Sequence, residues 1–197
     1  MNSIKRIFSN HLIKTISATK ELNLKINEII KIADFLKKKI IKKKKIFLYG
    51  NGGSYADGSH FVAELVSTYK KKNRKALPFI MLGSNLPSLT AWSNDNDYKT
   101  FLIREIDALS SEGDVLILIS TSGGNIKTNQ SINLLNLAKF SKKKKLSLIS
   151  FLGKKEGAIG KFSNIKFHTN SNDTPIIQEN QQVIFHLISE YLDKNFK

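Results

Sequence analysis

The sequence predicts an α/β fold in which five parallel strands form a sheet with helices on both faces. Short, nearly continuous apolar runs alternate with amphipathic stretches of helical length, the pattern of strands buried on both sides. Gly- and Ser-rich turns follow the first and third of these runs, where a strand would lead into a helix. Helical periodicity before the first run adds an N-terminal helical extension to the prediction.

The N-terminal segment predicts two amphipathic helices. Apolar residues fall at helical spacing in residues 4–16 and again in residues 22–36. Two helices before the first strand exceed what a minimal α/β domain requires, and such an extension often packs against another subunit. We therefore expect residues 1–40 to be helices for oligomer packing and residues 41–197 to form one α/β domain.

The rest of the chain alternates between strand and helix. The expected strands are Ile46–Tyr49, Leu77–Leu82, Val115–Ile119, Leu146–Leu152 and Ile165–His168. The expected helices cover residues 55–69, 86–93, 99–109, 126–140 and 175–192. Parallel sheets bind ligands outside the carboxyl ends of their strands, beside helix N-termini. Both Gly/Ser turns fall at that edge of the predicted sheet.

The composition is that of a globular protein and excludes several kinds of site. Hydrophobic residues make up 41% and charged residues 24% of the chain. Without cysteine there are no disulfides, Cys-ligated zinc sites or iron–sulfur clusters. No apolar run approaches the ~18 residues that span a bilayer, and the N-terminus lacks the apolar segment of a signal peptide. We expect a cytoplasmic protein with no membrane partner.

The formal charge of +16 does not by itself predict nucleic-acid binding. The excess is nearly all lysine, since arginine occurs only at Arg6, Arg74 and Arg104, whereas specific nucleic-acid readers favour arginine. Lysine runs such as Lys42–Lys45 and Lys142–Lys145 directly precede predicted strands, which is typical of solvated helix ends. We expect no nucleic-acid partner, although a positive field would attract an anionic substrate.

The loop Ser120-Thr121-Ser122-Gly123 could bind a phosphate group. It offers three hydroxyls, and backbone N–H groups at the start of a helix. An ordinary helix cap has the same residue types, so the loop alone leaves both interpretations open. It is not a Walker loop, because no Gly-Lys-Ser/Thr ending follows.

The turn Gly50–Ser54 is a second possible anion site. Its three glycines would let the backbone approach a ligand closely, and Ser54 would cap the next helix. A tight strand-to-helix turn without ligand is the alternative. The third glycine of a dinucleotide fingerprint is missing, so we expect no nucleotide cofactor.

Two helix faces carry residues suited to acid/base chemistry or metal binding. His60 and Glu64 are four residues apart and share a face. They could be an acid/base pair, two metal ligands or a surface ion pair. On the last helix Gln178, Gln182 and His186 share a face, where a histidine between apolar neighbours is often simply packed. Neither face is decisive alone.

In combination these residues resemble the SIS (sugar isomerase) domain family, and within it the phosphoheptose isomerase branch, over nearly the whole chain. The strings that carry the resemblance are Gly50–Ser54, His60–Leu65, Asn94-Asp95, Glu112–Leu116, Ile119–Gly123 and Ile177–Glu179 with His186 beyond. The resemblance implies a single three-layer SIS domain of flavodoxin-like topology. It also implies a homotetramer with active sites shared between subunits, in which the N-terminal helices take part.

The resemblance further assigns residues to roles. The implied substrate contacts are Asn51, Gly52, Gly53, Ser54, Glu64, Asn94, Asp95, Ser120, Thr121, Ser122 and Gln178. The positions that match the ligands of one zinc ion per subunit are His60, Glu64, Gln178 and His186. Glu64 and His186 also match the family's proposed catalytic acid/base pair.

The implied reaction is the isomerisation of sedoheptulose 7-phosphate to D-glycero-D-manno-heptose 7-phosphate through an enediol, for the heptose of surface polysaccharide such as lipopolysaccharide or capsule. Moving a proton between C1 and C2 needs a base, for which the Glu64 carboxylate would serve. It also needs an acid for the oxygens, for which His186 is suited near neutral pH. Zinc could polarise the carbonyl or hold the geometry of the site.

Three short sequence motifs differ from those that are usual in the family. Where the family usually has Gly-Arg-Tyr, this chain has Ser67-Thr68-Tyr69. Where the family has Arg-Ile-Gln-Glu, this chain has Ile176–Glu179. The last serine of the family motif Ser-Thr-Ser-Gly-Asn-Ser has no counterpart after Gly124. These differences leave open an isomerase of another phosphorylated ketose, or a non-catalytic SIS protein that binds a sugar phosphate or a partner. The presence of both Glu64 and His186 favours an enzyme.

Overall fold

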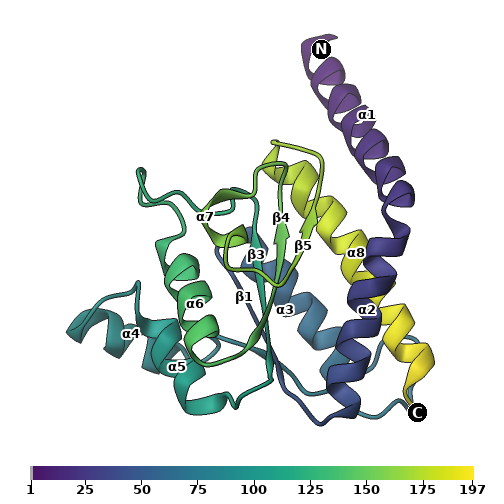
Figure 1. Cartoon of the computed structure of the whole chain (residues 1–197). Helices are drawn as coiled ribbons and strands as arrows, with labels where there is room; N and C mark the ends of the chain where they lie inside the picture. Colours follow the sequence, from purple (N-terminus) through teal and green to yellow (C-terminus); the bar gives the residue numbers. More distant parts are fainter. Residues whose placement is uncertain (1) are drawn as a thin grey trace.

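A five-stranded parallel sheet lies between layers of helices in the computed structural model, which describes residues 2–197 (Figure 1). The strands are β1 (Ile46–Gly50), β2 (Phe79–Met81), β3 (Val115–Ser120), β4 (Ser147–Leu152) and β5 (Ile165–His168). They lie in the order β2-β1-β3-β4-β5, and every neighbouring pair is parallel. This is the flavodoxin-like order, so the predicted fold class is confirmed.

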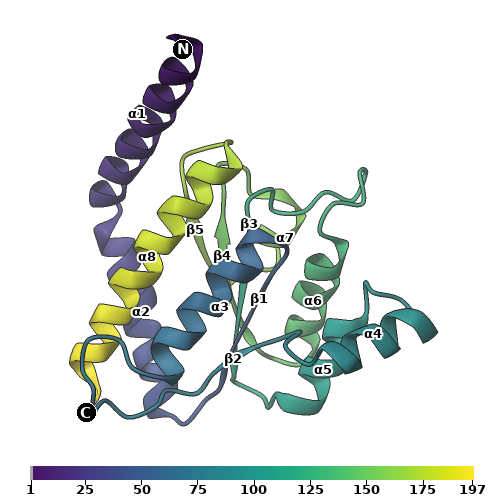
Figure 2. The same ribbon diagram turned by 180° about the vertical axis from the view of Figure 1, so that it is seen from behind.

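The helices divide between the two faces of the sheet (Figures 1 and 2). One face is covered by α2 (Ile26–Ile41), α3 (Gly53–Val66) and α8 (Thr174–Asn195). The other carries α5 (Phe101–Leu109), α6 (Ile132–Lys143) and the short α7 (Gly157–Gly160), with α4 (Leu86–Asp95) beside α5 at the margin. In the part of the chain that the structure describes, none of the helices has the length and apolarity that a membrane crossing requires.

Each central strand contributes to two hydrophobic cores, one on either face. Ile46 and Leu48 of β1 are buried with the α2, α3 and α8 layer, whereas Phe47 and Tyr49 are buried on the α5 and α6 side. Successive strand residues point to opposite faces, and both faces here are covered. This double burial explains why the strands read as continuous apolar runs.

Helix α1 (Asn2–Leu24) projects past the sheet, alongside the first turns of α8 (Figures 1 and 2). Six of its apolar side chains are 54–66% exposed, namely those of Ile4, Ile7, Phe8, Leu12, Ile13 and Ile16, whereas Leu22 near its end is buried. In contrast, α2 buries Ile29, Ile32 and Leu36 in the core. The division of the chain at residue 40 and the packing role of both helices stay predictions.

Several predicted boundaries shift. The helix expected at 126–140 begins only at Ile132, because residues before it form a small loop closed by two backbone hydrogen bonds between Asn125 and Gln130. Ser131, just before the helix, has a φ of +56°, which stops the helix from extending backward. The helix expected to reach residue 69 ends at Val66, and the four-residue α7 was not predicted.

Candidate functional site

The two Gly/Ser turns leave neighbouring strands at the same edge of the sheet. Strands β1 and β3 are paired in register, with Gly50 opposite Ile119. The turn after β1 and the loop after β3 therefore lie beside each other at the carboxyl edge, where parallel sheets bind ligands. The structure confirms the predicted location of both turns.

The turn after β1 is tightly packed at two of its glycines. A Cβ on Gly50 would lie 2.8 Å from the backbone of Ser54, and one on Gly53 would lie 2.3 Å from Nε2 of Gln178. Gly52 adopts a φ of +55°, which a side chain disfavours. The glycines thus let the Gln178 amide, from α8, rest against the first turn of α3.

Asn51 is held by a partner from a distant part of the chain. Its Nδ2 donates to Oδ1 of Asn133 at 3.1 Å, and Nδ2 of Asn133 donates back to Oδ1 of Asn51 at 2.8 Å. The Tyr98 hydroxyl lies 3.5 Å from the Asn133 amide and 3.2 Å from the Tyr49 hydroxyl. Burial, followed by this contact with Tyr98, raises the pKa of Tyr49, so the Tyr49 hydroxyl stays a neutral hydrogen-bond partner.

Sequence reasoning missed Asn133 and Tyr98. Nothing in the local sequence marks either residue, because each meets Asn51 or Tyr49 only through tertiary packing. Their presence means that the Asn51 side chain is already oriented before any ligand arrives.

The loop after β3 is held by its own serines. Oγ of Ser120 accepts from the N–H of Gly123 at 3.1 Å, and Oγ of Ser122 accepts from the N–H of Gly124 at 3.3 Å. Ser120 is only 5% exposed, so its hydroxyl fixes the loop from within. A Cβ on Gly123 would lie 2.3 Å from the carbonyl oxygen of Glu156, so the loop packs closely against the start of α7.

An open pocket of about 730 Å³ lies beside this loop. Its lining includes Thr121 and Ser122 from this loop, Asn172 just before α8, and Thr174 at the start of α8. Of the three predicted hydroxyl donors, two therefore face a space that can hold a ligand. Gln178 lies one helical turn beyond Thr174, where α8 touches Gly53.

The acid/base candidates come together between α3 and α8. Nε2 of His60 lies 3.0 Å from Oε1 of Glu64, and the His60 ring packs edge-on to the His186 ring with centroids 5.2 Å apart. Tyr69, which sequence reasoning did not single out, stacks on His186 at 6.1 Å. The predicted His60/Glu64 face and His186 thus form one cluster.

The two helices run side by side in the same direction, which is why these residues meet. Contacts join Gly53 to Gln178 near the start of both helices. Farther along, Oδ1 of Asp57 accepts from Nε2 of Gln182 at 2.9 Å, one turn before the histidine pair. Burial is the largest influence on the Asp57 carboxyl and raises its pKa, against the opposing effects of Gln182 and His60.

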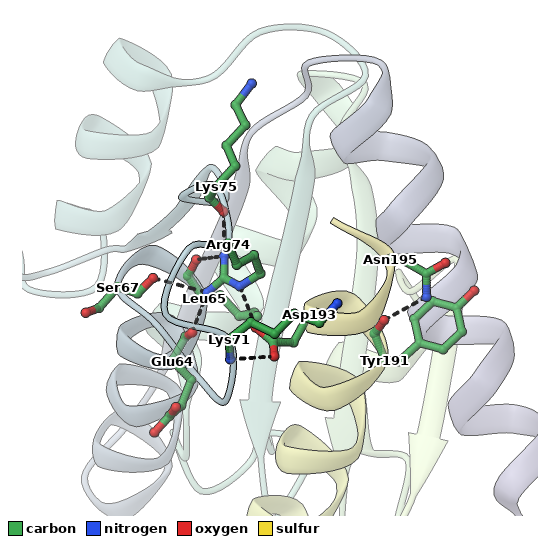
Figure 3. Close-up of polar contacts among 9 residues, drawn as sticks. All are labelled: Glu64, Leu65, Ser67, Lys71, Arg74, Lys75, Tyr191, Asp193 and Asn195. Carbon is green, nitrogen blue, oxygen red and sulfur yellow. Dashed lines mark hydrogen bonds and ion pairs between the residues drawn. The ribbon is translucent and has the colours of Figure 1, made fainter. Parts of the chain in front are cut away.

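Arg74 clamps the far ends of α3 and α8 together (Figure 3). Its side chain is fully buried, and all five of its N–H groups donate hydrogen bonds. The acceptors are the Asp193 carboxylate at 2.9 Å and the backbone oxygens of Glu64, Leu65, Ser67 and Lys75 at 2.6–3.2 Å. The second Asp193 oxygen accepts from the N–H of Lys71 at 3.0 Å. The clamp fixes the turn that carries Glu64, a role that the sequence did not reveal.

The predicted metal ligands do not all meet within one chain. His60, Glu64 and His186 supply imidazole and carboxylate groups of the kind that zinc binds, so the chemistry of this cluster fits the ion. Gln178 lies eight residues before His186 on one helix, which separates them by about 12 Å along the axis. In residues 2–197, no three His, Asp or Glu side chains are grouped closely enough to hold a metal ion.

Asn94 and Asp95 lie apart from both turns, at the exposed end of α4. Nδ2 of Asn94 donates to Oδ1 of Asp95 at 2.9 Å, and within the described chain no hydrogen bond joins either side chain to the turns. The segment that follows them does reach the site, since it carries Tyr98 to Asn133.

The chain is similar to known proteins in both sequence and structure. A sequence model described as SIS domain matches residues 8–155. A probable phosphoheptose isomerase from Thermoplasma acidophilum is 37% identical over 179 residues, 91% of this chain and 94% of that protein. Phosphoheptose isomerase 1 from Campylobacter jejuni is 35% identical over 196 residues and the full length of both chains. A solved phosphoheptose isomerase structure from Francisella tularensis superposes with a TM-score of 0.86 at 25% identity, covering 98% of this chain and all of that one.

Proposed function

The chain belongs to the SIS domain family, and from that premise we propose that it is a phosphoheptose isomerase, which converts sedoheptulose 7-phosphate into D-glycero-D-manno-heptose 7-phosphate. The observation that carries the proposal is the cluster of His60, Glu64 and His186 between α3 and α8. The hydroxyl-lined pocket at the carboxyl edge adds a place for the phosphate. Full-length relatives that bear this enzyme name support the choice of substrate.

The reaction needs two proton movements that the cluster can perform. Glu64 as a carboxylate takes a proton from C1 of the ketose, while His186 donates a proton to the oxygen at C2, which gives an enediol. His186 then takes the proton from the oxygen at C1, and Glu64 returns its proton to C2. The aldose forms with no net gain or loss of protons. The Arg74 clamp keeps the Glu64 turn in place during both steps.

Zinc, one ion per subunit, is part of the proposal. His60, Glu64 and His186 would hold it after their side chains turn toward a common point, since they are not grouped closely enough for an ion in this structure, and Gln178 would complete the set from a neighbouring subunit. When bound, the ion would polarise the substrate carbonyl or fix the geometry of the site.

A homotetramer with shared active sites accounts for the split between the two halves of the site. Glu64 lies eleven residues beyond Gly53 on α3, about 16 Å along the helix axis at 1.5 Å per residue. That span is long for one sugar phosphate to bridge within a chain. The exposed apolar face of α1 supports a role for the N-terminal helices in this assembly. We place the enzyme in the cytoplasm, where its product would supply heptose for lipopolysaccharide or capsule.

The direct test is an isomerase assay with purified protein and sedoheptulose 7-phosphate, with and without added zinc. We expect turnover by the wild type, and a loss of about 10²- to 10⁴-fold in kcat for Glu64→Gln, the range for removal of a general base. Glu112→Gln, an exposed carboxylate, is the matched control and should keep full activity. Absence of wild-type turnover under both conditions would refute the proposed reaction, and an unchanged rate for Glu64→Gln would refute the mechanism.

The loop that follows Ser122 favours a second candidate, an isomerase of a different phosphorylated ketose. Residues 125–131 form a closed loop in place of the first helical turns, and four of them line the pocket. Comparing kcat/KM for phosphorylated ketoses of five, six and seven carbons decides between the two. A clear preference for a shorter sugar would favour the second candidate, and binding without turnover of any of them would favour a non-catalytic protein.

A further inference from the structure

Three lysines surround the pocket beside the Ser120–Gly123 loop. Lys127 comes from the loop closed by Asn125 and Gln130, Lys155 lies just before α7, and Lys161 lies just after it. Lys127 is distant in the sequence from the other two, which flank the four-residue α7, and the fold brings all three to one cavity. No aspartate or glutamate is among the residues that line it. The described walls of the pocket therefore carry only positive formal charge.

The three ammonium groups are not engaged elsewhere. Within residues 2–197, none of them makes an ion pair or a side-chain hydrogen bond, whereas lysines such as Lys70 and Lys144 pair with carboxylates. The nearby Glu156 carboxylate is paired with Lys166 at 2.8 Å. That hydrogen bond is the main reason why the pKa of Glu156 is lowered, so Glu156 is committed to Lys166. Glu156 also interacts with the charge of Lys161, but within residues 2–197 no carboxylate pairs with Lys127, Lys155 or Lys161, and three such charges around one cavity favour an anionic ligand.

The backbone holds one of these lysines in a defined place. The N–H of Lys127 donates to Oδ1 of Asn125 at 2.9 Å, and the two backbone hydrogen bonds between Asn125 and Gln130 close the loop. Gly124, with a φ of +76°, lies directly before this loop and turns the chain into it. Lys127 therefore stands on an ordered loop beside the pocket that Thr121 and Ser122 line.

We propose that Lys127, Lys155 and Lys161 form a cationic subsite that binds the phosphate group of the substrate together with Thr121 and Ser122. A phosphate monoester carries a charge of about −1.5 to −2 at neutral pH and three acceptor oxygens. Neutral hydroxyls can satisfy the oxygens but not the charge, and lysine binds phosphate as a point charge. The assignment rests on the proposed function in its choice of a sugar phosphate, and it adds the residues that supply the charge.

The test compares two triple variants that lose the same charge. Lys127→Gln/Lys155→Gln/Lys161→Gln removes the subsite. Lys38→Gln/Lys142→Gln/Lys143→Gln removes three exposed lysines near the C-terminal ends of α2 and α6, at the opposite edge of the sheet. For the subsite variant we expect KM for sedoheptulose 7-phosphate to rise roughly tenfold or more with kcat changed less than about twofold, because uniform binding is lost. The control should keep its KM.

Calorimetric titration with inorganic phosphate and with sedoheptulose 7-phosphate separates this proposal from the proposed reaction. Binding of these ligands that depends on the three lysines, without turnover, would support the subsite and refute the isomerase. Turnover with the same KM in wild type and subsite variant would refute the subsite alone. Equal losses of affinity in both triple variants would assign the effect to net charge and overturn the proposal, as would a wild type that binds neither ligand.

Discussion

At the scale of single residues, Glu105 makes the stability of the fold depend on pH. It lies half-buried on α5, and its Oε2 accepts the backbone N–H of Gly83 at 2.7 Å. Burial raises the pKa of this carboxyl, and the hydrogen bond from Gly83 opposes the rise only in part. A raised pKa in the folded state means that the native protein binds this proton more tightly than the unfolded chain does.

Replacing Glu105 by glutamine should therefore stabilise the protein at neutral pH. The stability linked to the neutral carboxyl is fully present below the unfolded pKa of about 4.3 and is lost as the pH rises through the higher folded value. Glutamine keeps an acceptor for Gly83 without the buried charge. Urea unfolding at pH 4 and pH 7 should give a higher midpoint for Glu105→Gln at pH 7 and a smaller gain at pH 4. A gain that is larger at pH 4 would contradict this account.

The sequence predicted which residues lie at the site, but it did not predict their hydrogen-bond partners. Sequence patterns placed Asn51 and Ser120 at the carboxyl edge of the sheet, and the structure confirms that location. They did not reveal that Asn51 pairs with Asn133 or that Ser120 is turned inward to Gly123. The Asn51–Asn133 pair depends on packing between segments far apart in sequence, which local residue patterns do not encode. The Ser120–Gly123 hydrogen bond lies within one loop and depends on the backbone conformation of that loop.

At the scale of secondary-structure elements, Arg74 couples the ends of α3 and α8. A buried ion pair that loses one partner leaves an uncompensated charge, which typically costs 3–5 kcal/mol. Here the loss would also strip a donor from the carbonyl oxygens of Glu64, Leu65 and Ser67. These carbonyls belong to the end of α3, so its last turn depends on a residue outside the helix.

Arg74→Met should lower the free energy of unfolding by about 3–5 kcal/mol. Adding Asp193→Leu to it should cost less than the sum of the two single changes, because the unpaired carboxylate is then absent. Chemical denaturation of the three variants measures the coupling. Strictly additive losses would show that Arg74 acts through the carbonyls alone and that its ion pair with Asp193 contributes nothing.

The elements themselves were largely predictable, and the main error has a physical cause. Apolar runs located β1 to β4, which are almost entirely buried. The edge strand β5 is less fully covered and carries the exposed Lys166. Residues 126–131 were assigned to a helix, yet Ile126 is 63% exposed and backbone hydrogen bonds between Asn125 and Gln130 replace helical ones. A polar, glycine-led segment supports such a loop as readily as a helix, and the sequence alone did not distinguish them.

At the scale of the whole molecule, the separation of Gln178 from the His186 cluster calls for a second subunit. If sites are shared, a site needs Glu64 from one chain and Gln178 from another. Two inactive variants, Glu64→Gln and Gln178→Ala, would then complement each other when mixed during assembly, because some sites receive both intact residues.

Co-expression of these two variants should restore up to about a quarter of wild-type activity, the fraction of sites that random mixing leaves intact in a symmetric assembly. Each variant purified alone is the control and should stay inactive. Light scattering on the same samples should give the mass of a tetramer. A mixed assembly of that mass with no recovered activity would show that each chain builds its site alone.

The parallel alignment of α3 and α8 has an electrostatic consequence. Each helix carries the equivalent of roughly half a positive charge at its N-terminus, from aligned peptide dipoles. Gly53 and Thr174 open these helices at the carboxyl edge of the sheet, so the two partial charges point to the same region. At the other end of α3, the guanidinium of Arg74 meets the negative pole of the dipole. The fold itself therefore favours an anion at the carboxyl edge, and a protein stripped of Lys127, Lys155 and Lys161 should retain a residual affinity for phosphate.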